Sequence, residues 1–201
     1  MVKKYNDDSI NLYEGAERIR KKVASMLGSD GLEGTKQGVL EILGNSLDEA
    51  SSGYGDHLIF KIHDDDSLSI RDFGRGCPLG WNEKHQRWNY ELVYAELYAS
   101  GKHDSLQEEL KSVKDWDNFD VWSIPYIFSI GTNGVGAAST QYASEWAIVK
   151  SYYDGKCHEM RFEKGEPILD ELLVYDSDEQ SGTYFQWKPD PTIFSDVNIP
   201  I

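Results

Sequence analysis

The stretch Glu41-Ile42-Leu43-Gly44-Asn45-Ser46-Leu47-Asp48-Glu49-Ala50 carries two helical patterns at once. Apolar residues recur at three- and four-residue spacing, at Val39, Leu40, Leu43 and Leu47. Polar residues recur at helical spacing on a second face, at Glu41, Asn45, Asp48 and Glu49. The first pattern predicts a helix from Gly38 to Ser51 with an apolar face. The second gathers three carboxylates and one amide on the other side, with no lysine or arginine to neutralise them.

An acidic helix face that stands alone is most often solvated surface. Here two glycine clusters follow it along the chain. They are Phe73-Gly74-Arg75-Gly76-Cys77-Pro78 and Gly131-Thr132-Asn133-Gly134-Val135-Gly136. The helix and the two clusters together predict a nucleotide site.

The composition favours one packed domain. The chain has 201 residues, of which 39% are hydrophobic, enough for a sizeable core. With 20 basic and 35 acidic residues the net charge is −15, so we expect neither DNA, RNA nor an anionic membrane to bind this segment by itself. A bound nucleotide would need backbone amides or a metal ion to accept its phosphates.

The two cysteines, Cys77 and Cys157, are too few for a disulfide scaffold in a chain of this length. Reduced thiols and a cytoplasmic location are therefore expected. The sequence has no apolar run of membrane-spanning length and no apolar signal core at its start, so we expect no membrane partner.

Helices are predicted in the first part of the chain and strands in the second. We expect helices at 13–26 (ending near Gly28), 38–51, 91–99 and 135–143, and a glycine-rich turn at 28–35. Strands are expected at 57–63, 67–72, 146–152, 156–162, 172–175 and 183–187, with a turn at 64–66. Residues 1–14 read as an arm that orders against something else, and 100–130 as a lid or flap. This order predicts an α+β two-layer sandwich, with a mixed, mostly antiparallel β-sheet and helices on one face.

The chemistry of each pattern has an ordinary alternative. Asn45 offers a hard oxygen ligand for Mg²⁺, and Glu41 one turn earlier could deprotonate a water; the alternative for Asn45 is a local hydrogen bond within the helix. Asp72 at a strand end could accept the exocyclic amine of adenine while glycines let the ring lie on backbone; the alternative is a turn. Amides of the second glycine cluster before a helix could hold phosphates; the alternative is a hinge.

The order of the three patterns resembles the Bergerat ATP-binding fold, shared by type II topoisomerase ATPase subunits, Hsp90 chaperones, MutL proteins and sensor histidine kinases. The resemblance is closest to the N-terminal ATPase domain in the B subunits of bacterial DNA gyrase and topoisomerase IV, and covers almost the whole chain. The stretches that carry it are 41–50, 67–78, Ala99-Ser100-Gly101-Lys102, Gly182-Thr183 and Lys188-Pro189-Asp190-Pro191, together with Tyr5 and Ile10 of the arm.

The resemblance implies a role for each matching residue, with ATP and Mg²⁺ as ligands. Glu41 would be the general base and Asn45 the metal ligand. Asp72 would bind adenine with Thr183 acting through a water, Arg75 would cover the pocket and pair with Glu49, and Asp48 would support this polar shell. Residues from the adenine-site loop would be Gly74, Gly76 and Pro78. The phosphates would be held by Lys102 and by the amides of Gly131, Asn133, Gly134, Val135 and Gly136.

The resemblance also implies partners. Residues 1–14 would embrace a second copy of the chain, and residues 15–201 would form the ATP-binding domain. Transducer and DNA-cleavage domains are absent from this chain, so we expect an excised fragment with slow or undetectable turnover. Through those missing domains, the longer protein would bind DNA and a gyrase A or topoisomerase IV A-type subunit, and ATP-driven dimerisation would gate strand passage. Aminocoumarin-type inhibitors are possible ligands of the ATP site.

Several positions depart from the family pattern. Gly44 and Phe73 stand where the family has aspartates, Asn133 where it often has histidine, and Tyr153 near an arginine that lines the inhibitor pocket; residues 22–28 also differ. They leave gyrase versus topoisomerase IV open and put aminocoumarin sensitivity in doubt. Another Bergerat ATPase of MutL or Hsp90 type, or a nucleotide-responsive dimerisation module with little hydrolysis, remain alternatives. A histidine kinase is disfavoured, since no helix with a phospho-accepting histidine precedes the domain.

Overall fold

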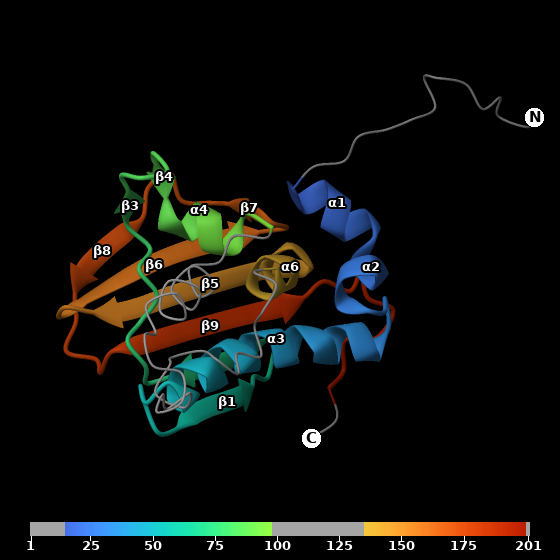
Figure 1. Ribbon diagram of the computed structural model, residues 1–201. Helices are drawn as coiled ribbons and strands as arrows, with labels where there is room; N and C mark the ends of the chain where they lie inside the picture. The colour runs from blue at the N-terminus through green and yellow to red at the C-terminus, as the bar shows by residue number, and fades with distance from the viewer. Residues whose placement is uncertain (1–14, 98–134, 200–201) are drawn as a thin grey trace, which may run out of the picture.

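The computed structural model describes residues 15–97 and 135–199 (Figure 1). The predicted arm, the predicted lid and four candidate phosphate-binding residues lie outside this part of the chain: Lys102, Gly131, Asn133 and Gly134. The described residues form one large sheet with helices packed on it, and a separate two-stranded hairpin.

The large sheet has seven strands in the order β1-β2-β9-β5-β6-β7, with β8 also paired to β6. Every strand pair among the described residues is antiparallel, which confirms the expected mostly antiparallel sheet. The strands are β1 Leu58–Ile62, β2 Leu68–Asp72, β5 Ser144–Tyr153, β6 Lys156–Glu163, β7 Glu166–Pro167, β8 Leu173–Asp176 and β9 Gly182–Pro189; the hairpin pairs β3 Trp81–Asn82 with β4 Arg87–Trp88.

Helices cover one face of this sheet (Figure 1). The helices over the sheet are α3 Leu32–Ser51, α4 Asn89–Tyr94 and α6 Gly136–Tyr142, whereas α1 Gly15–Lys21 and α2 Val23–Leu27 pack against α6, and α2 also against α3. The main core joins Ile42 of α3 and Tyr94 of α4 to Val149, Phe185 and Trp187 of the sheet. The expected α+β two-layer arrangement is therefore confirmed.

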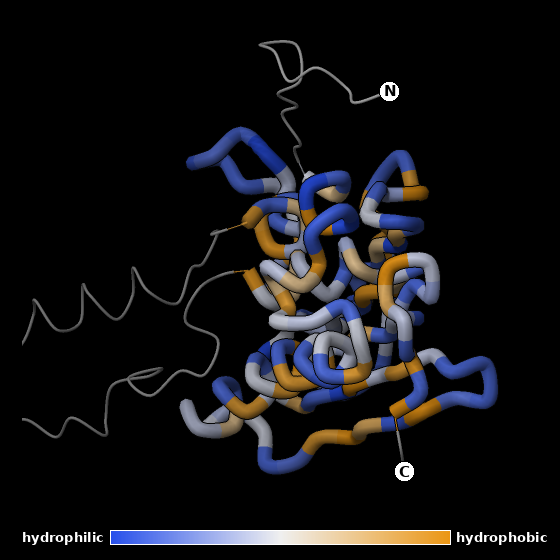
Figure 2. The backbone as a smooth tube through the Cα atoms, turned by 90° about the vertical axis from the view of Figure 1, so that its right-hand side faces the viewer, coloured by the Kyte–Doolittle hydropathy of each residue, from blue (hydrophilic) through white to orange (hydrophobic). Residues whose placement is uncertain are grey.

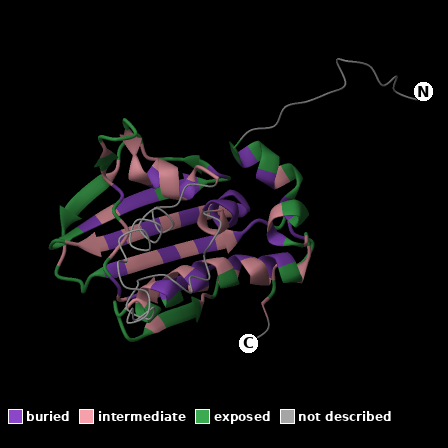
Figure 3. Ribbon diagram, viewed as in Figure 1, coloured by how far each residue is buried: buried purple, intermediate pink, exposed green. Residues whose placement is uncertain are grey.

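The core follows from the alternation of side chains along the central strands. In β9, Phe185 and Trp187 are buried while their neighbours Tyr184 and Gln186 are partly exposed, because successive residues of a strand face opposite sides of the sheet. Figure 3 shows this alternation of buried and intermediate residues in the central strands, and exposed residues in β1 and β8 at the margins. In Figure 2 the hydrophilic stretches lie mostly in the peripheral loops.

The central helix begins earlier than predicted. It starts at Leu32, so the expected glycine-rich turn at 28–35 is wrong in its second half. A Cβ at Gly34 would lie 2.0 Å from the backbone oxygen of Ser29 and 3.1 Å from the ring of Phe194. Gly34 therefore permits close packing within a helix rather than a turn.

The predicted apolar face of this helix is partly wrong. Val39 and Leu43 pack against the main core as expected, but Leu40 and Leu47 are 55% and 40% exposed, and apart from Ile42 the buried residues are small or polar. The buried residues of α3 are Gly34, Thr35, Gly38, Ile42, Gly44, Ser46 and Asp48. Small side chains let α3 lie close to α6, where the Thr140 hydroxyl donates to the carbonyl of Gly38 at 3.4 Å.

Other boundaries differ in smaller ways. The first predicted helix is broken at Lys22 into α1 and α2. α2 ends at Leu27, and Gly28 is its C-cap in the left-handed conformation, as expected from a glycine cap. The predicted helix at 91–99 is α4, which starts at Asn89 and ends at Tyr94. Strands of two residues, in the hairpin and at β7, were not predicted because they are too short to show a period. No helix in the described part of the chain is long and apolar enough to cross a membrane.

Candidate functional site

Asp72, at the end of β2, is the best-oriented carboxylate at the predicted site. Its side chain is nearly buried, at 8% exposure. Oδ1 accepts hydrogen bonds from the backbone N–H groups of Gly74 and Thr183, both at 3.0 Å, and Oδ2 accepts one from the Ser46 hydroxyl at 3.2 Å. Because each carboxylate oxygen can accept two hydrogen bonds, the donors among the described residues leave Oδ2 with one acceptor position for another donor.

The loop after Asp72 passes close to the sheet. Gly76 has φ of +83°, and a Cβ there would lie 2.7 Å from the backbone oxygen of Tyr152. Only glycine fits this conformation and this distance without displacing the strand. The following Pro78 is exposed.

Arg75 of the same loop forms the expected ion pair with Glu49. Its Nε and Nη2 atoms donate to the two carboxylate oxygens of Glu49, each at 3.1 Å, and its guanidinium lies 3.9 Å from the ring centre of Tyr54. The Arg75 side chain is 47% exposed, so this pair contributes little to stability. The pair joins the loop after Asp72 to α3.

Phe73, a departure from the family pattern, belongs to a stack beside Asp72. Its ring centre lies 4.1 Å from that of His57, and the Arg71 guanidinium lies 4.7 Å from Phe73 and 4.5 Å from Tyr152. Arg71 also donates to the backbone oxygens of Asp72 and Gln180, and burial lowers its pKa. The stack thus holds the backbone around Asp72 without touching its carboxylate oxygens.

Glu41 belongs to α3, and its side chain lies beside the start of α6. Oε1 accepts a hydrogen bond from Nε2 of Gln37, one turn earlier, at 2.8 Å. A Cβ at Gly136 would fall 2.0 Å from Oε2, so the carboxylate lies directly against the first residue of α6. Gln37 therefore orients one oxygen of Glu41 and leaves the other facing the helix N-terminus, whose N-cap is Val135.

Asp48 and Asn45, on the predicted polar face of α3, are not solvated surface. Asp48 is 1% exposed, and Asn45, one turn after Glu41, is partly buried. Among the described residues no three His, Cys, Asp or Glu side chains are grouped to hold a metal ion. The amide oxygen of Asn45 is a suitable Mg²⁺ ligand, and the remaining ligands would come from phosphates and water.

The structure thus brings some predicted residues together and adds two that were not predicted. Thr183 meets Asp72, Arg75 meets Glu49, and Gly136 meets Glu41. Ser46 and Gln37 were missed, although Gln37 precedes Glu41 by four residues, the spacing of helical neighbours. Nothing local in the sequence indicates that Ser46 reaches Asp72, 26 residues away.

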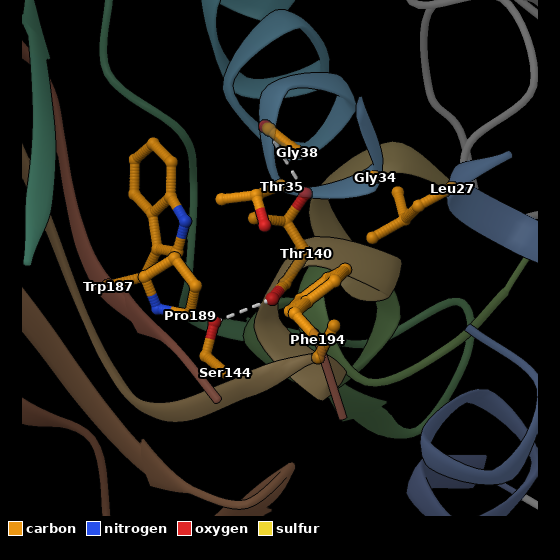
Figure 4. Close-up of a pocket in the computed structure, with 10 residues that line it drawn as sticks. Leu27, Gly34, Thr35, Gly38, Thr140, Ser144, Trp187, Pro189 and Phe194 are labelled. Carbon is orange, nitrogen blue, oxygen red and sulfur yellow. Dashed lines mark hydrogen bonds between the residues drawn. The ribbon is translucent and has the colours of Figure 1, made fainter. Parts of the chain in front are cut away.

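A small hollow lies at the opposite end of α3, between the helices and the end of β9 (Figure 4). It is lined by Leu27, Thr35, Thr140, Trp187 and Phe194, among others, and is barely large enough for a water molecule. The Ser144 hydroxyl donates to the Thr140 carbonyl at 2.6 Å beside it. We interpret it as a packing gap, not as a ligand site.

Comparison with known proteins gives a consistent family. No family model matches the chain. It is 36% identical over 191 residues to the B subunit of DNA topoisomerase 4 from Bacillus subtilis, covering 95% of this chain and 26% of that protein. It is 33% identical over 196 residues to the B subunit of DNA gyrase from Thermotoga maritima, covering 98% of this chain and 28% of that protein. The chain therefore spans about a quarter of the length of these relatives.

A solved structure supports the same relationship. The 43K ATPase domain of Thermus thermophilus gyrase B, in complex with an aminocoumarin, matches with a TM-score of 0.66 and 29% sequence identity. The match covers 89% of this chain and 40% of that one. Similarity in both sequence and fold extends over the described elements that carry the site.

Proposed function

Because this chain belongs to the family of ATPase domains found in the B subunits of type IIA topoisomerases, we propose that it binds ATP with Mg²⁺ and hydrolyses it. The observation that carries this proposal is Asp72. Its carboxylate is held by three neutral donors and keeps one acceptor position on Oδ2. That position suits the 6-amino group of adenine, whereas the 6-carbonyl of guanine would be repelled.

Hydrolysis is assigned to the acidic face of α3. Glu41, oriented by Gln37, would take a proton from the attacking water. Asn45 would hold Mg²⁺, which would neutralise phosphate charge when bound. Lys102 and the amides of the second glycine cluster, through Val135 and Gly136, would hold the phosphates. These groups act mainly by positioning and charge neutralisation.

The roles of the whole protein are also proposals. In a longer protein the arm at 1–14 would join a second copy, and further domains would bind an A-type subunit and DNA, so that ATP-driven dimerisation gates strand passage. Relatives of both the gyrase and topoisomerase IV type have similar identity to the chain, so the choice between them stays open. An aminocoumarin is bound in the Thermus relative. Tyr153, which stacks on His158 at 4.2 Å, would present a ring instead of the family's arginine to such a ligand.

Calorimetric titration with a non-hydrolysable ATP analogue and Mg²⁺ tests the proposal. We expect the wild type to bind and Asp72→Asn to bind far more weakly, while Asp64→Asn, in an exposed turn, binds like the wild type. Absence of binding by the wild type would contradict the proposal. Binding without hydrolysis in a longer chain, unaffected by Glu41→Ala, would favour the nucleotide-responsive dimerisation module instead.

A further inference from the structure

A row of polar residues crosses the sheet at the Asp72 end. Thr183 of β9 is in register with Ser151 of β5, and Ser151 with His158 of β6. Thr183 also donates its backbone N–H to Asp72 of β2. Partners in register on antiparallel strands point to the same face, here the face under the helices, since Val149 and Phe185 two residues away belong to the main core.

Ser151 is the unexplained member of this row. The residue is 0% exposed, and its hydroxyl has no hydrogen-bond partner among the described residues. A Cβ added to Gly76 would lie 3.0 Å from its oxygen, so the hydroxyl lies directly beneath the loop that follows Asp72. A buried hydroxyl without a partner is uncommon and requires an explanation, such as a bound ligand.

The neighbouring side chain does not supply the missing partner. The ring of His158 is stacked parallel to Tyr153 at 4.2 Å, and its Nδ1 also has no partner in the described part of the chain. Burial and the charge of Lys156 lower the pKa of His158. Because neither the Ser151 hydroxyl nor Nδ1 of His158 has a hydrogen-bond partner in the described part of the chain, the hydroxyl proton of Ser151 remains available to a ligand.

Adenine offers the complementary atom. If its 6-amino group donates to Asp72, the adjacent ring nitrogen N1 presents an acceptor on the same edge. The Asp72 carboxylate cannot donate, and the N–H of Thr183 is already engaged. The hydroxyls of Thr183 and Ser151 are then the donors in this row, and of the two it is the Ser151 hydroxyl that is buried without a partner among the described residues. We infer that the Ser151 hydroxyl donates to N1, directly or through one water, and so acts as a further base-specificity residue. This inference rests on the proposed ATP site.

A ligand-based double-mutant cycle tests it. The dissociation constants of the wild type and Ser151→Ala are measured for a non-hydrolysable ATP analogue and for its 1-deaza counterpart, in which C–H replaces N1. We expect the wild type to prefer the N1-containing ligand by roughly three- to tenfold, the range for one hydrogen bond. Ser151→Ala should lose this preference. Ser139→Ala, which removes another buried hydroxyl without a partner in the described part of the chain, on α6, should keep it.

The other outcomes are distinguishable. Equal weakening of both ligands by Ser151→Ala would mean a packing role and overturn the inference, as would an unchanged preference. If Ser151→Ala does not fold, Ser151→Thr, which keeps the hydroxyl, should retain the preference for N1; losing it would also overturn the inference. If the wild type binds neither ligand, the proposed function fails and the inference fails with it; Asp72-dependent binding without a Ser151 effect overturns the inference alone.

Discussion

Two buried aspartates, Asp190 and Asp72, lie near opposite ends of β9 and have different hydrogen-bond and ion-pair partners. Asp190, just after the strand, is 1% exposed, forms an ion pair with Arg20, and accepts from the N–H and hydroxyl of Thr192 at 2.8 and 2.6 Å. Asp72, beside the start of the strand, is held only by neutral donors, and no Lys or Arg of the described residues forms an ion pair with its carboxylate. The charge of the Asp190 carboxylate is neutralised by Arg20 of the same chain. The Asp72 carboxylate at the candidate site is oriented by hydrogen bonds but is not neutralised by any described Lys or Arg, so it can bind a ligand.

The ion pair of Arg20 and Asp190 joins segments that are distant in the sequence. Arg20 of α1 also donates to the backbone oxygens of Tyr142 and Ser144 at 3.2 and 3.1 Å, where α6 ends and β5 begins. The pair therefore ties α1 to the segment after β9 and to the end of α6, whose other end touches Glu41.

Removing the Arg20–Asp190 ion pair should lower the stability of the protein more than any other change that we propose. Arg20→Ala would leave Asp190 buried and without its cation, so we expect the free energy of unfolding to fall by about 3–5 kcal/mol. Urea denaturation measures this. Arg18→Ala, on the exposed face of the same helix, is the matched control and should change stability little. Equal losses in both variants would show that the contribution comes from α1 as a whole.

Asp72→Asn should weaken nucleotide binding more than it lowers the stability of the protein. We expect ATP-analogue binding to weaken by about 1.5–3 kcal/mol, the range for a hydrogen bond to a charged group, with a smaller loss of stability than in Arg20→Ala. Calorimetry and urea denaturation of the same sample check both. A loss of stability as large as that of Arg20→Ala would remove the distinction between the two aspartates.

Asp190 should also make stability depend on pH. Burial by itself would raise the pKa of Asp190, but hydrogen bonds from Thr192 and Arg20 and the charge of Arg20 lower it below its usual value. Its stabilising contribution is then complete above the unfolded-state pKa of about 3.9 and is lost as pH falls through the lower folded-state pKa. The stability difference between wild type and Asp190→Asn should shrink as pH falls from about 5 to about 3. A constant difference over that range would contradict this assignment.

Gln37→Ala tests positioning at the other oriented carboxylate. Without its hydrogen-bond donor, Glu41 would be less well placed, and we expect ATP turnover to fall by roughly tenfold with nucleotide affinity nearly unchanged. Steady-state hydrolysis and calorimetry, measured on a chain that turns over, separate the two effects. Lys36→Ala, on the adjacent residue and paired with exposed Glu33, is the control.

The smallest effect is expected from Arg75→Ala. The ion pair with Glu49 is half exposed, so its loss should cost no more than about 1 kcal/mol of stability. A larger loss of stability, measured by urea denaturation, would mean that the Arg75–Glu49 pair contributes to the stability of the fold as a buried contact does.

The sequence by itself indicated the layers and the main carboxylates. Strands were expected at 146–152, 156–162 and 183–187 from the runs between turn signals, and β5, β6 and β9 lie there. Local patterns also predicted that Asp72 lies at the end of a strand before a glycine loop and that Glu41 lies on a helix. The family resemblance added the roles of these residues, which remain proposals.

The tertiary structure decided which groups meet. Ser46 and the N–H of Thr183 reach Asp72 across 26 and 111 residues of sequence, and no local pattern records such contacts. The buried face of α3 was mispredicted in part for the same reason: Val39 and Leu43 pack on the core as expected, but small and polar side chains also face α6 and the sheet, while Leu40 and Leu47 remain exposed. Hydrophobicity alone predicts what can be buried, but only the packing of distant segments determines what is.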